Sequence, residues 1–219
     1  MRDQHGEMAN DFWPFFDLRV RTPTVELRCP TDDDLPTIAA LAAEGIHDPA
    51  TMPFLLPWTR VEPPDLQRGV LQFIWGRRAA LTRDDWSLPF VVVHDDQPVG
   101  VQDLFAKQFP VRRAVESGSW LVERAQGRGI GTEMRAAVLH LAFAGLDARE
   151  AHSGSFADNT ASAAVSRRNG YEPNGEETVA REGEPARMLR WVLTHERWST
   201  RRRDDITIDG LDACLPLLT

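Results

Sequence analysis

Residues 120–132 combine a strand, a short basic turn and three glycines at alternate positions, and an apolar-striped helix follows directly. The three glycines are Gly127, Gly129 and Gly131. Alternate glycines let main-chain N–H groups approach an anion without a Cβ in the way, and the positive end of the helix dipole points at the same place. Arg124, Gln126 and Arg128 would add side-chain donors. The segment is typical of a pyrophosphate-binding loop, and it also suits an ordinary strand-to-helix turn.

The spacing of these glycines excludes two common nucleotide sites. A dinucleotide-binding G-x-G-x-x-G would need a third glycine at position 132, which is Thr132. A Walker loop needs a lysine after its second glycine, and the only lysine, Lys107, has no glycine framing it. The remaining pattern is Q-x-x-G-x-G, formed by Gln126, Gly129 and Gly131.

Length and composition predict one domain with appendages. The chain has 219 residues, of which 42% are hydrophobic, enough for one sizeable core. No apolar run approaches the roughly 20 residues that cross a bilayer, and the first residues lack the apolar segment of a signal peptide. We therefore expect a soluble, cytoplasmic protein. Cys29 and Cys214 form no C-x-x-C pair, so we expect neither a disulfide framework nor a metal site.

The net charge of -8 argues against a nucleic-acid-binding protein, because such proteins present basic surfaces to phosphate. Several arginines nevertheless lie in or near the glycine loop or other parts of the predicted site. They are Arg112, Arg113, Arg124, Arg128, Arg167 and Arg168. These arginines predict a local positive patch for a polyanionic ligand, or else solvated surface side chains.

Hydrophobic periodicity predicts an α/β (α+β) fold. Strands are expected at residues 25–29, 88–94, 99–105, 114–123, 150–156, 171–176 and 186–194. Helices are expected at residues 33–44, from Pro63 onwards, from 130 to about 145, and at 159–169. This order predicts a mixed sheet of about six to seven strands flanked by about four helices. We expect residues 1–23 to form an N-terminal arm, residues 24–195 the domain, and residues 196–219 an extension. The alternating segment at 206–210 suits an added strand, which could pair with a neighbouring subunit.

The Q-x-x-G-x-G pattern resembles the acyl-coenzyme A loop of the GNAT N-acyltransferase superfamily, and the element order over residues 24–195 is that of the GNAT fold. A second signature agrees, with Asn159 at a helix start and Gly170-Tyr171 one helix later. The N-x-x-S spacing of Asn159 and Ser162 is similar to the RimJ/RimL branch. Residues 85–89, 117–121 and 165–171 resemble mycobacterial members associated with succinyl-CoA.

This resemblance implies an acetyl-CoA or succinyl-CoA co-substrate. The residues that it assigns to coenzyme binding are Trp120, Leu121, Val122, Gln126, Gly127, Arg128, Gly129, Ile130, Gly131, Thr132, Asn159, Ser162 and Arg168. In GNAT proteins the loop amides bind the pyrophosphate, N–H groups like those near Leu121 and Val122 bond the thioester carbonyl, and the asparagine bonds the pantetheine arm. Asn159 also suits a plain helix N-cap.

The catalytic residues predicted are Glu116 and Ser162. Many relatives carry a tyrosine acid seven residues after the asparagine, where this chain has Ser166, so the resemblance points to Ser162 as the partner of the leaving thiol; a serine bonding its own helix is the alternative. Glu116 is the first choice as general base, and a solvated or salt-bridged glutamate is the alternative. The other candidates for the base are His152, Asp103, His47 and a water relay.

The acceptor pocket is predicted in the loop that holds His47, Phe54 and Trp58, although such aromatic residues also suit a core. A succinyl carboxylate would need a cation, for which Arg60 or Arg113 is available. The sequence therefore predicts an acyl-CoA-dependent N-acyltransferase, expected to be a homo-oligomer (dimer), that acts on a small-molecule amine or a protein N-terminus. The alternatives are a non-catalytic acyl-CoA sensor and a protein-interaction module that binds no coenzyme.

Overall fold

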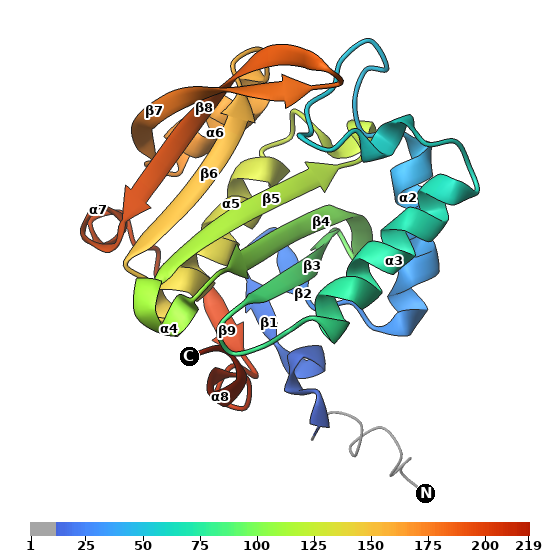
Figure 1. Ribbon diagram of the computed structural model, residues 1–219. Helices are drawn as coiled ribbons and strands as arrows, with labels where there is room; N and C mark the ends of the chain where they lie inside the picture. The colour runs from blue at the N-terminus through green and yellow to red at the C-terminus, as the bar shows by residue number, and fades with distance from the viewer. Residues whose placement is uncertain (1–11) are drawn as a thin grey trace, which may run out of the picture.

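A mixed nine-stranded sheet runs through the protein in the order β7-β8-β6-β5-β4-β3-β2-β1-β9 (Figure 1). The structure is a computed structural model and describes residues 12–219. The strands are β1 (Arg19–Arg21), β2 (Glu26–Arg28), β3 (Trp86–His94), β4 (Gln97–Ala106), β5 (Ala114–Leu121), β6 (Glu150–Phe156), β7 (Glu172–Arg181), β8 (Glu184–Thr194) and β9 (Thr207–Asp209). The helices are α2 (Leu35–Glu44), α3 (Asp65–Ala79), α4 (Phe109–Arg112), α5 (Ile130–His140), α6 (Thr160–Arg168), α7 (His195–Ser199) and α8 (Leu215–Leu218).

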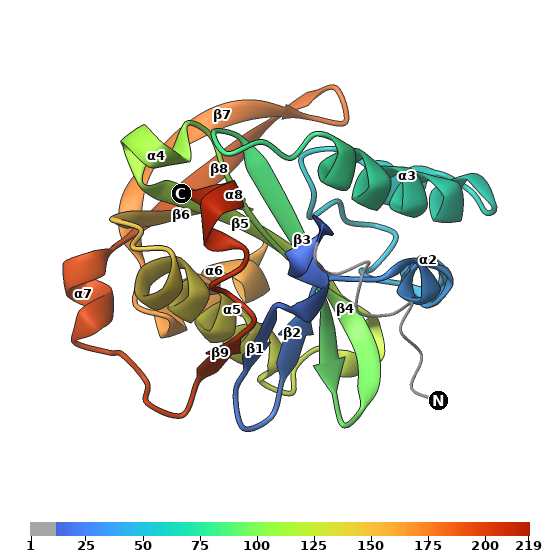
Figure 2. The same ribbon diagram turned by 90° about the horizontal axis from the view of Figure 1, so that it is seen from below.

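Two layers of helices cover the sheet (Figure 2). On one face, here called the α3 face, apolar residues of α2 and α3 pack against Val91 of β3 and Val101 of β4. On the other, here called the α5 face, Met134 and Val138 of α5 belong to the larger core cluster. The α5 stripe expected from sequence is therefore buried, and the mixed sheet with helices on both faces is confirmed.

The sheet has more strands than the six to seven predicted, because short pieces of the arm and the tail extend its edge. β1 pairs with β2, and β9 pairs with β1, with Val20 opposite Ile208. The alternating tail segment thus adds a strand within its own chain. The boundary predicted at residue 24 falls inside the β1–β2 hairpin, and residues 1–11 of the predicted arm lie outside the described residues. The short helices α4, α7 and α8 account for the helices beyond the four predicted.

Local signals explain where the long elements begin and end. Thr31 and Asp34 form a reciprocal capping box before α2. The side chain of Asn159 accepts a hydrogen bond from the Ser162 N–H at the start of α6, as expected of an N-cap, and Gly170 follows that helix with φ 89°. Helix α5 ends earlier than predicted, because its last turn, Leu141–Gly145, is a π-helix.

Candidate functional site

β5 and β6 are parallel neighbours that pair only at their beginnings. The last pair is Glu116 with His152; beyond it, β5 pairs only with β4, and β6 only with β8. Figure 1 shows the two strands diverging, with α5 behind the opening. The Val122 N–H donates to the Val99 carbonyl at 3.0 Å. Because N–H groups alternate along a strand, the Leu121 N–H points to the opposite edge of β5, toward the opening. Of the two amides predicted for the thioester carbonyl, only that of Leu121 is directed there.

The glycine loop joins β5 to α5. Gly127 and Gly129 have φ of 72° and 87°, a conformation that L side chains rarely adopt. A Cβ on Gly131 would lie 3.5 Å from Cγ2 of Val165, so this glycine lets α5 start close to α6. The described chain provides no acceptor for the main-chain N–H groups of residues 127–131. The loop therefore presents unpaired donors at the positive end of a helix dipole, which suits an anion.

The side chains around this loop mostly hold it in place. Gln126 donates from Nε2 to the carbonyls of Ile46, at 2.6 Å, and Leu121, at 2.8 Å. Arg124 forms an ion pair with Glu44 at 2.7 Å. Of the three side chains predicted as extra donors, Gln126 and Arg124 are thus engaged with the protein. Arg128 is largely exposed, and its guanidinium lies 3.4 Å from His94 Nε2 and 3.8 Å from an acidic side chain. Main-chain groups dominate this site.

Helix α6 lies against the start of α5. Asn169 donates from Nδ2 to the Thr132 carbonyl at 3.3 Å, and Val165 contacts Gly131. Ser162 lies one turn before Val165 on the same helical stripe, because residues three and four apart share a face. Within residues 12–219 no hydrogen bond involves Ser162 Oγ, so the predicted alternative of a bond to its own helix does not occur. Arg168 is exposed at the far end of α6.

The predicted acceptor residues form a continuous row of rings on the α3 face. Ring centroids are 5.7 Å apart for His47 and Phe54, 5.3 Å for Phe54 and Trp58, and 6.1 Å for Trp58 and Trp120. The row therefore connects the α2–α3 loop to β5. Both ring nitrogens of His47 have partners, the Thr59 hydroxyl at 2.7 Å and a main-chain carbonyl at 2.9 Å, which makes His47 a poor candidate for the base.

The candidate bases occupy three neighbouring strands on this face. Strand alternation places Glu116 on the same side of β5 as Trp120, and Glu116 is exposed. His152 Nε2 lies 3.0 Å from Glu150 Oε2. Asp103 of β4 is 8% exposed and accepts a hydrogen bond from Ser87 Oγ at 2.8 Å. Burial raises the pKa of Asp103 to about 6. The residues therefore share a face, and Glu116 and His152 are neighbours in the β5–β6 register, but no hydrogen bond or ion pair joins the three side chains.

The α5 face also holds a buried polar cluster that the sequence does not predict. Arg135 is 4% exposed, donates to Ser153 Oγ at 3.1 Å, and has no ion-pair partner within residues 12–219. Arg135 Nε is buried without a partner in the described chain, and the buried Tyr171 hydroxyl lies beside Ser117 and Arg135. Burial raises the pKa of Tyr171. Ser117 and Ser153 directly follow the last β5–β6 pair, so the cluster lies where the strands part. The one signal in the sequence is an arginine beside the apolar stripe of α5.

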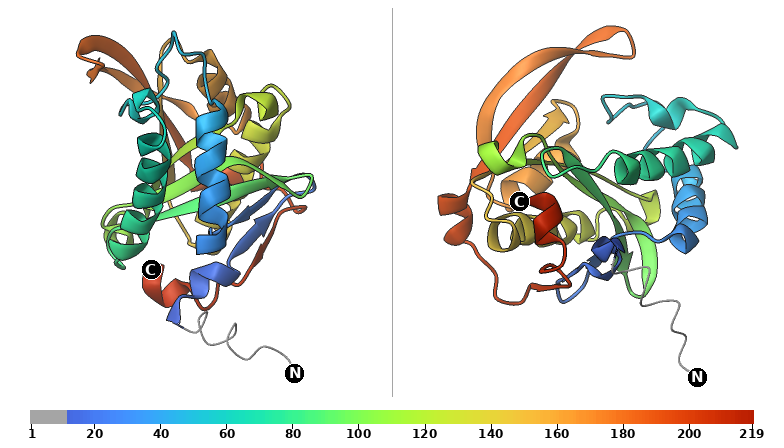
Figure 3. Two further views of the ribbon diagram at one scale, coloured as in Figure 1. Left: turned by 90° about the vertical axis from the view of Figure 1, so that its right-hand side faces the viewer. Right: turned by 60° about the horizontal axis from the view of Figure 1, so that its bottom comes forward.

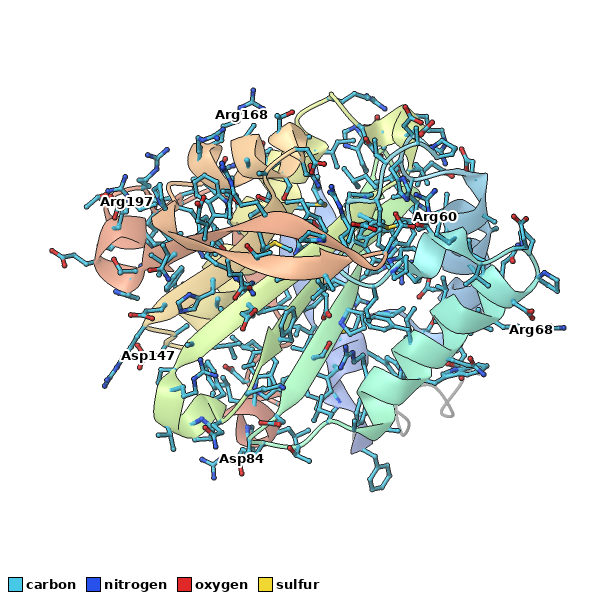
Figure 4. All side chains as sticks on the ribbon, turned by 45° about the horizontal axis from the view of Figure 1, so that its top comes forward. Arg60, Arg68, Asp84, Asp147, Arg168 and Arg197 are labelled. Carbon is cyan, nitrogen blue, oxygen red and sulfur yellow. The ribbon has the colours of Figure 1, made fainter. Side chains whose placement is uncertain are left out.

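The two arginines predicted for an acyl carboxylate lie elsewhere. Arg60 donates from Nε to Glu182 at 2.7 Å, which joins the α2–α3 loop to the tip of the β7–β8 hairpin (Figures 3 and 4). Arg113 precedes β5, at the end away from the glycine loop, and donates to the Leu146 carbonyl at 3.2 Å. Neither side chain is free to bind a ligand without giving up these contacts.

Within residues 12–219, no helix is long and apolar enough to cross a membrane. The same residues contain no group of three or more His, Cys, Asp or Glu side chains arranged to hold a metal ion.

Comparisons with known proteins agree with this geometry. Residues 24–172 match the family described as acetyltransferase (GNAT) domain. The fold is similar to Mycobacterium smegmatis RimJ in complex with a coenzyme A disulfide, with 19% identity, a TM-score of 0.67, and coverage of 93% of this chain and 95% of that one. It is also similar to RimL, a ribosomal L7/L12 alpha-N-protein acetyltransferase bound to coenzyme A, with 22% identity, a TM-score of 0.63, and coverage of 79% and 95%. A third similar structure is mutant spermidine/spermine N-acetyltransferase SpeG from Vibrio cholerae, with 15% identity, a TM-score of 0.63, and coverage of 81% and 98%.

Proposed function

Because the chain belongs to the GNAT acetyltransferase family, we propose that it transfers an acetyl or succinyl group from coenzyme A directly to a primary amine. The observation that carries the proposal is the loop of unpaired amides at residues 127–131, which lies beside the opening between β5 and β6. A pyrophosphate supplies the acceptors that these amides lack, and the opening gives a thioester access to the Leu121 N–H.

The remaining parts of the coenzyme fit the neighbouring residues. Asn159 uses its Oδ1 as the N-cap of α6 and has Nδ2 available for an amide of the pantetheine arm. Ser162, whose hydroxyl has no partner in the described chain, lies on the stripe of α6 that faces the start of α5. We assign Arg128 and Arg168, both exposed, to the outer phosphates.

The chemistry requires a neutral amine, a stabilised oxyanion and a proton for the departing sulfur. Glu116 takes the proton that the amine nitrogen loses as it attacks the thioester carbon, either directly or through a water molecule. The Leu121 N–H donates to the carbonyl oxygen as negative charge develops on it. When the C–S bond breaks, the Ser162 hydroxyl passes its proton to the thiolate and regains one from water.

The succinyl donor is supported by Arg135 rather than by the arginines predicted from sequence. A buried guanidinium without a carboxylate partner is expensive, because its desolvation is not offset by an opposite charge. Arg135 lies where β5 and β6 part, and Ser153 and Tyr171 offer further hydroxyl groups there. The free carboxylate of a succinyl group is the partner that this cluster lacks, whereas an acetyl group would leave it unpaired.

The acceptor is proposed to be a primary amine on a protein N-terminus or a small molecule. RimL and SpeG are named for a protein N-terminus and for polyamines, which are all amines. The row of rings from His47 to Trp120 lies on the same face as Glu116 and would contact the apolar part of such an acceptor.

A thermal-shift comparison of acetyl-CoA, succinyl-CoA and free coenzyme A tests the proposal. A ligand that binds only the folded state raises the melting temperature in proportion to its affinity, and we expect the largest shift with succinyl-CoA. Thiol release on addition of primary amines then separates an enzyme from an acyl-CoA sensor, which would show the shift without the release. If none of the three compounds shifts the melting temperature, both the enzyme hypothesis and the acyl-CoA sensor hypothesis are contradicted.

A further inference from the structure

Asp103 is a buried carboxyl group without a cationic partner. Ser87 Oγ donates to its two carboxyl oxygens, and a main-chain hydrogen bond at Leu104 and the charge of Arg77 of α3 also favour its ionised form. No ion pair with Asp103 occurs within residues 12–219. Buried carboxylates are normally paired, because an isolated charge loses its hydration without compensation. The other glutamates of this face that lie near cations, Glu150 and Glu177, have partners in His152 and Arg190.

Open space lies above the residue that faces Asp103 on the neighbouring strand β5. Asp103 is directly opposite Gly118 in the β4–β5 register, and a Cβ placed on Gly118 would meet no heavy atom within 4 Å. Cross-strand neighbours share a face of the sheet, so the space above Gly118 lies on the α3 face between Glu116 and Trp120. Trp120 and Trp58 provide an aromatic wall at one end of this space.

We propose that Asp103 binds the ammonium group of the acceptor amine and that Gly118 keeps the approach to it open. The inference rests on the proposed function, since it names the charge and shape of the acceptor at that same site. A primary ammonium supplies the positive charge that Asp103 lacks, and its three N–H donors suit a carboxylate already held by Ser87. The bound ammonium group gives up one proton to water before the neutral amine attacks the thioester. The aromatic wall contacts the apolar stem of the amine.

The charged groups around Asp103 predict how the affinity for the ammonium group changes with pH. Arg77 faces it from α3 and favours the carboxylate, Glu116 of β5 lies one diagonal step away on the same face, and the buried Cys29 thiol nearby stays neutral because burial raises the pKa of Cys29. Burial raises the pKa of Asp103 to about 6. Below that pH the protonated carboxyl group no longer attracts a cation, so ammonium binding weakens on acidification.

The test is calorimetric titration of the full chain, in the presence of coenzyme A, with benzylamine and with its neutral counterpart benzyl alcohol. Wild-type protein is expected to bind benzylamine at least about tenfold more tightly than benzyl alcohol at neutral pH, a difference of about 1.4 kcal/mol. Asp103→Asn keeps the shape of the side chain and should remove the preference. Glu150→Gln alters a carboxylate that already has a partner and should leave the preference intact.

Gly118→Val provides a second variant that does not change charge. It fills the open space with a side chain that suits a strand, so it should weaken both ligands while the fold is retained. Three results would overturn the inference. They are a wild-type protein that shows no preference for benzylamine, a preference that survives in Asp103→Asn, and a preference that is lost in Glu116→Gln instead. The thermal shift with coenzyme A reports separately on the proposed function.

Discussion

The two faces of the sheet build their sites from different parts of the chain. On the α5 face the proposed coenzyme site consists of main-chain N–H groups whose directions are fixed by the positive φ of Gly127 and Gly129. On the α3 face the proposed acceptor site consists of side chains from the α2–α3 loop, β4 and β5. Side-chain substitutions on the α3 face should therefore alter acceptor use and turnover, whereas binding of the coenzyme pyrophosphate should change strongly only with backbone changes in the glycine loop.

The largest expected effect is that of Glu116→Gln on turnover. Loss of a general base typically lowers kcat by about 100-fold or more, because the amide cannot accept the proton of the amine. Coenzyme affinity should stay within about twofold of the wild-type value, since the loop amides are untouched. Steady-state kinetics of thiol release and a coenzyme titration measure the two quantities. Unchanged turnover would return the choice of base to Asp103, His152 or a water relay.

Gly129→Ala tests whether the main-chain N–H groups of the glycine loop bind the coenzyme. Gly129 and Gly175 both have φ of 87°, and a Cβ at either position would meet nothing within 4 Å. Alanine should therefore strain the backbone equally at both positions, by about 1–2 kcal/mol of folding stability. Only Gly129→Ala places a methyl group beside the anion-binding amides, so it alone should weaken coenzyme A binding, by about 30-fold. Equal binding by the two variants would show that the loop does not hold the coenzyme.

Asp103→Asn should stabilise the protein at neutral pH. Burial raises the pKa of Asp103 from 3.8 to about 6, so the native state favours the protonated form. A raised pKa contributes stability that is present below pH 3.8 and is lost as the pH rises through about 6. Roughly 2 pKa units at 1.36 kcal/mol each set a ceiling of about 3 kcal/mol on the gain from the neutral amide. Melting temperatures should show the gain at pH values above 6 and its disappearance in acid; a loss of stability at neutral pH would indicate a structural role.

Ser162→Ala should have a smaller effect on turnover than Glu116→Gln. Removal of one hydroxyl that carries a proton to the thiolate should lower kcat by about tenfold, because water can replace it in part. The Asn159 cap uses the Ser162 main-chain N–H, so α6 should keep its stability. Single-turnover measurements with saturating acyl-CoA isolate this step. A matched Ser155→Ala change, at a buried serine that donates no proton in the proposed reaction, should leave kcat unaffected.

The sequence was sufficient where local chemistry determines the structure. The glycine loop and the Asn159 cap were predicted because each depends on residues adjacent in the chain. The order of the long strands and helices was predicted for a similar reason, since the periodicity of each element is local.

The parts that the sequence did not predict depend on partners far apart in the chain. The engagement of Gln126 with Ile46, and of Arg60 with Glu182, requires the tertiary fold. The paired edge of β1 and β9 joins the two ends of the described chain, and three-residue strands give little periodic signal. The absence of an ion-pair partner for Arg135 within residues 12–219 becomes visible only when all its neighbours are known.

The smallest expected effect concerns the contact between Arg60 and Glu182, which links the row of rings to the β7–β8 hairpin. Arg60 also donates to the main-chain carbonyl of Thr51 at 3.3 Å, so it holds the α2–α3 loop as well as the hairpin. The hydrogen bond from Arg60 lowers the pKa of Glu182, and the contribution of the pair is therefore lost as the pH falls through that lowered value.

Arg60→Met and Glu182→Gln should each raise the KM for the amine by about threefold at low salt and have no effect at high salt, because exposed ion pairs are weak and screened. The double variant should behave like either single variant. The Arg187–Glu176 pair is a matched control within the same hairpin, and its removal should not change the KM. Additive effects of the two substitutions, or an effect on coenzyme affinity, would show that the contact does not belong to the acceptor side.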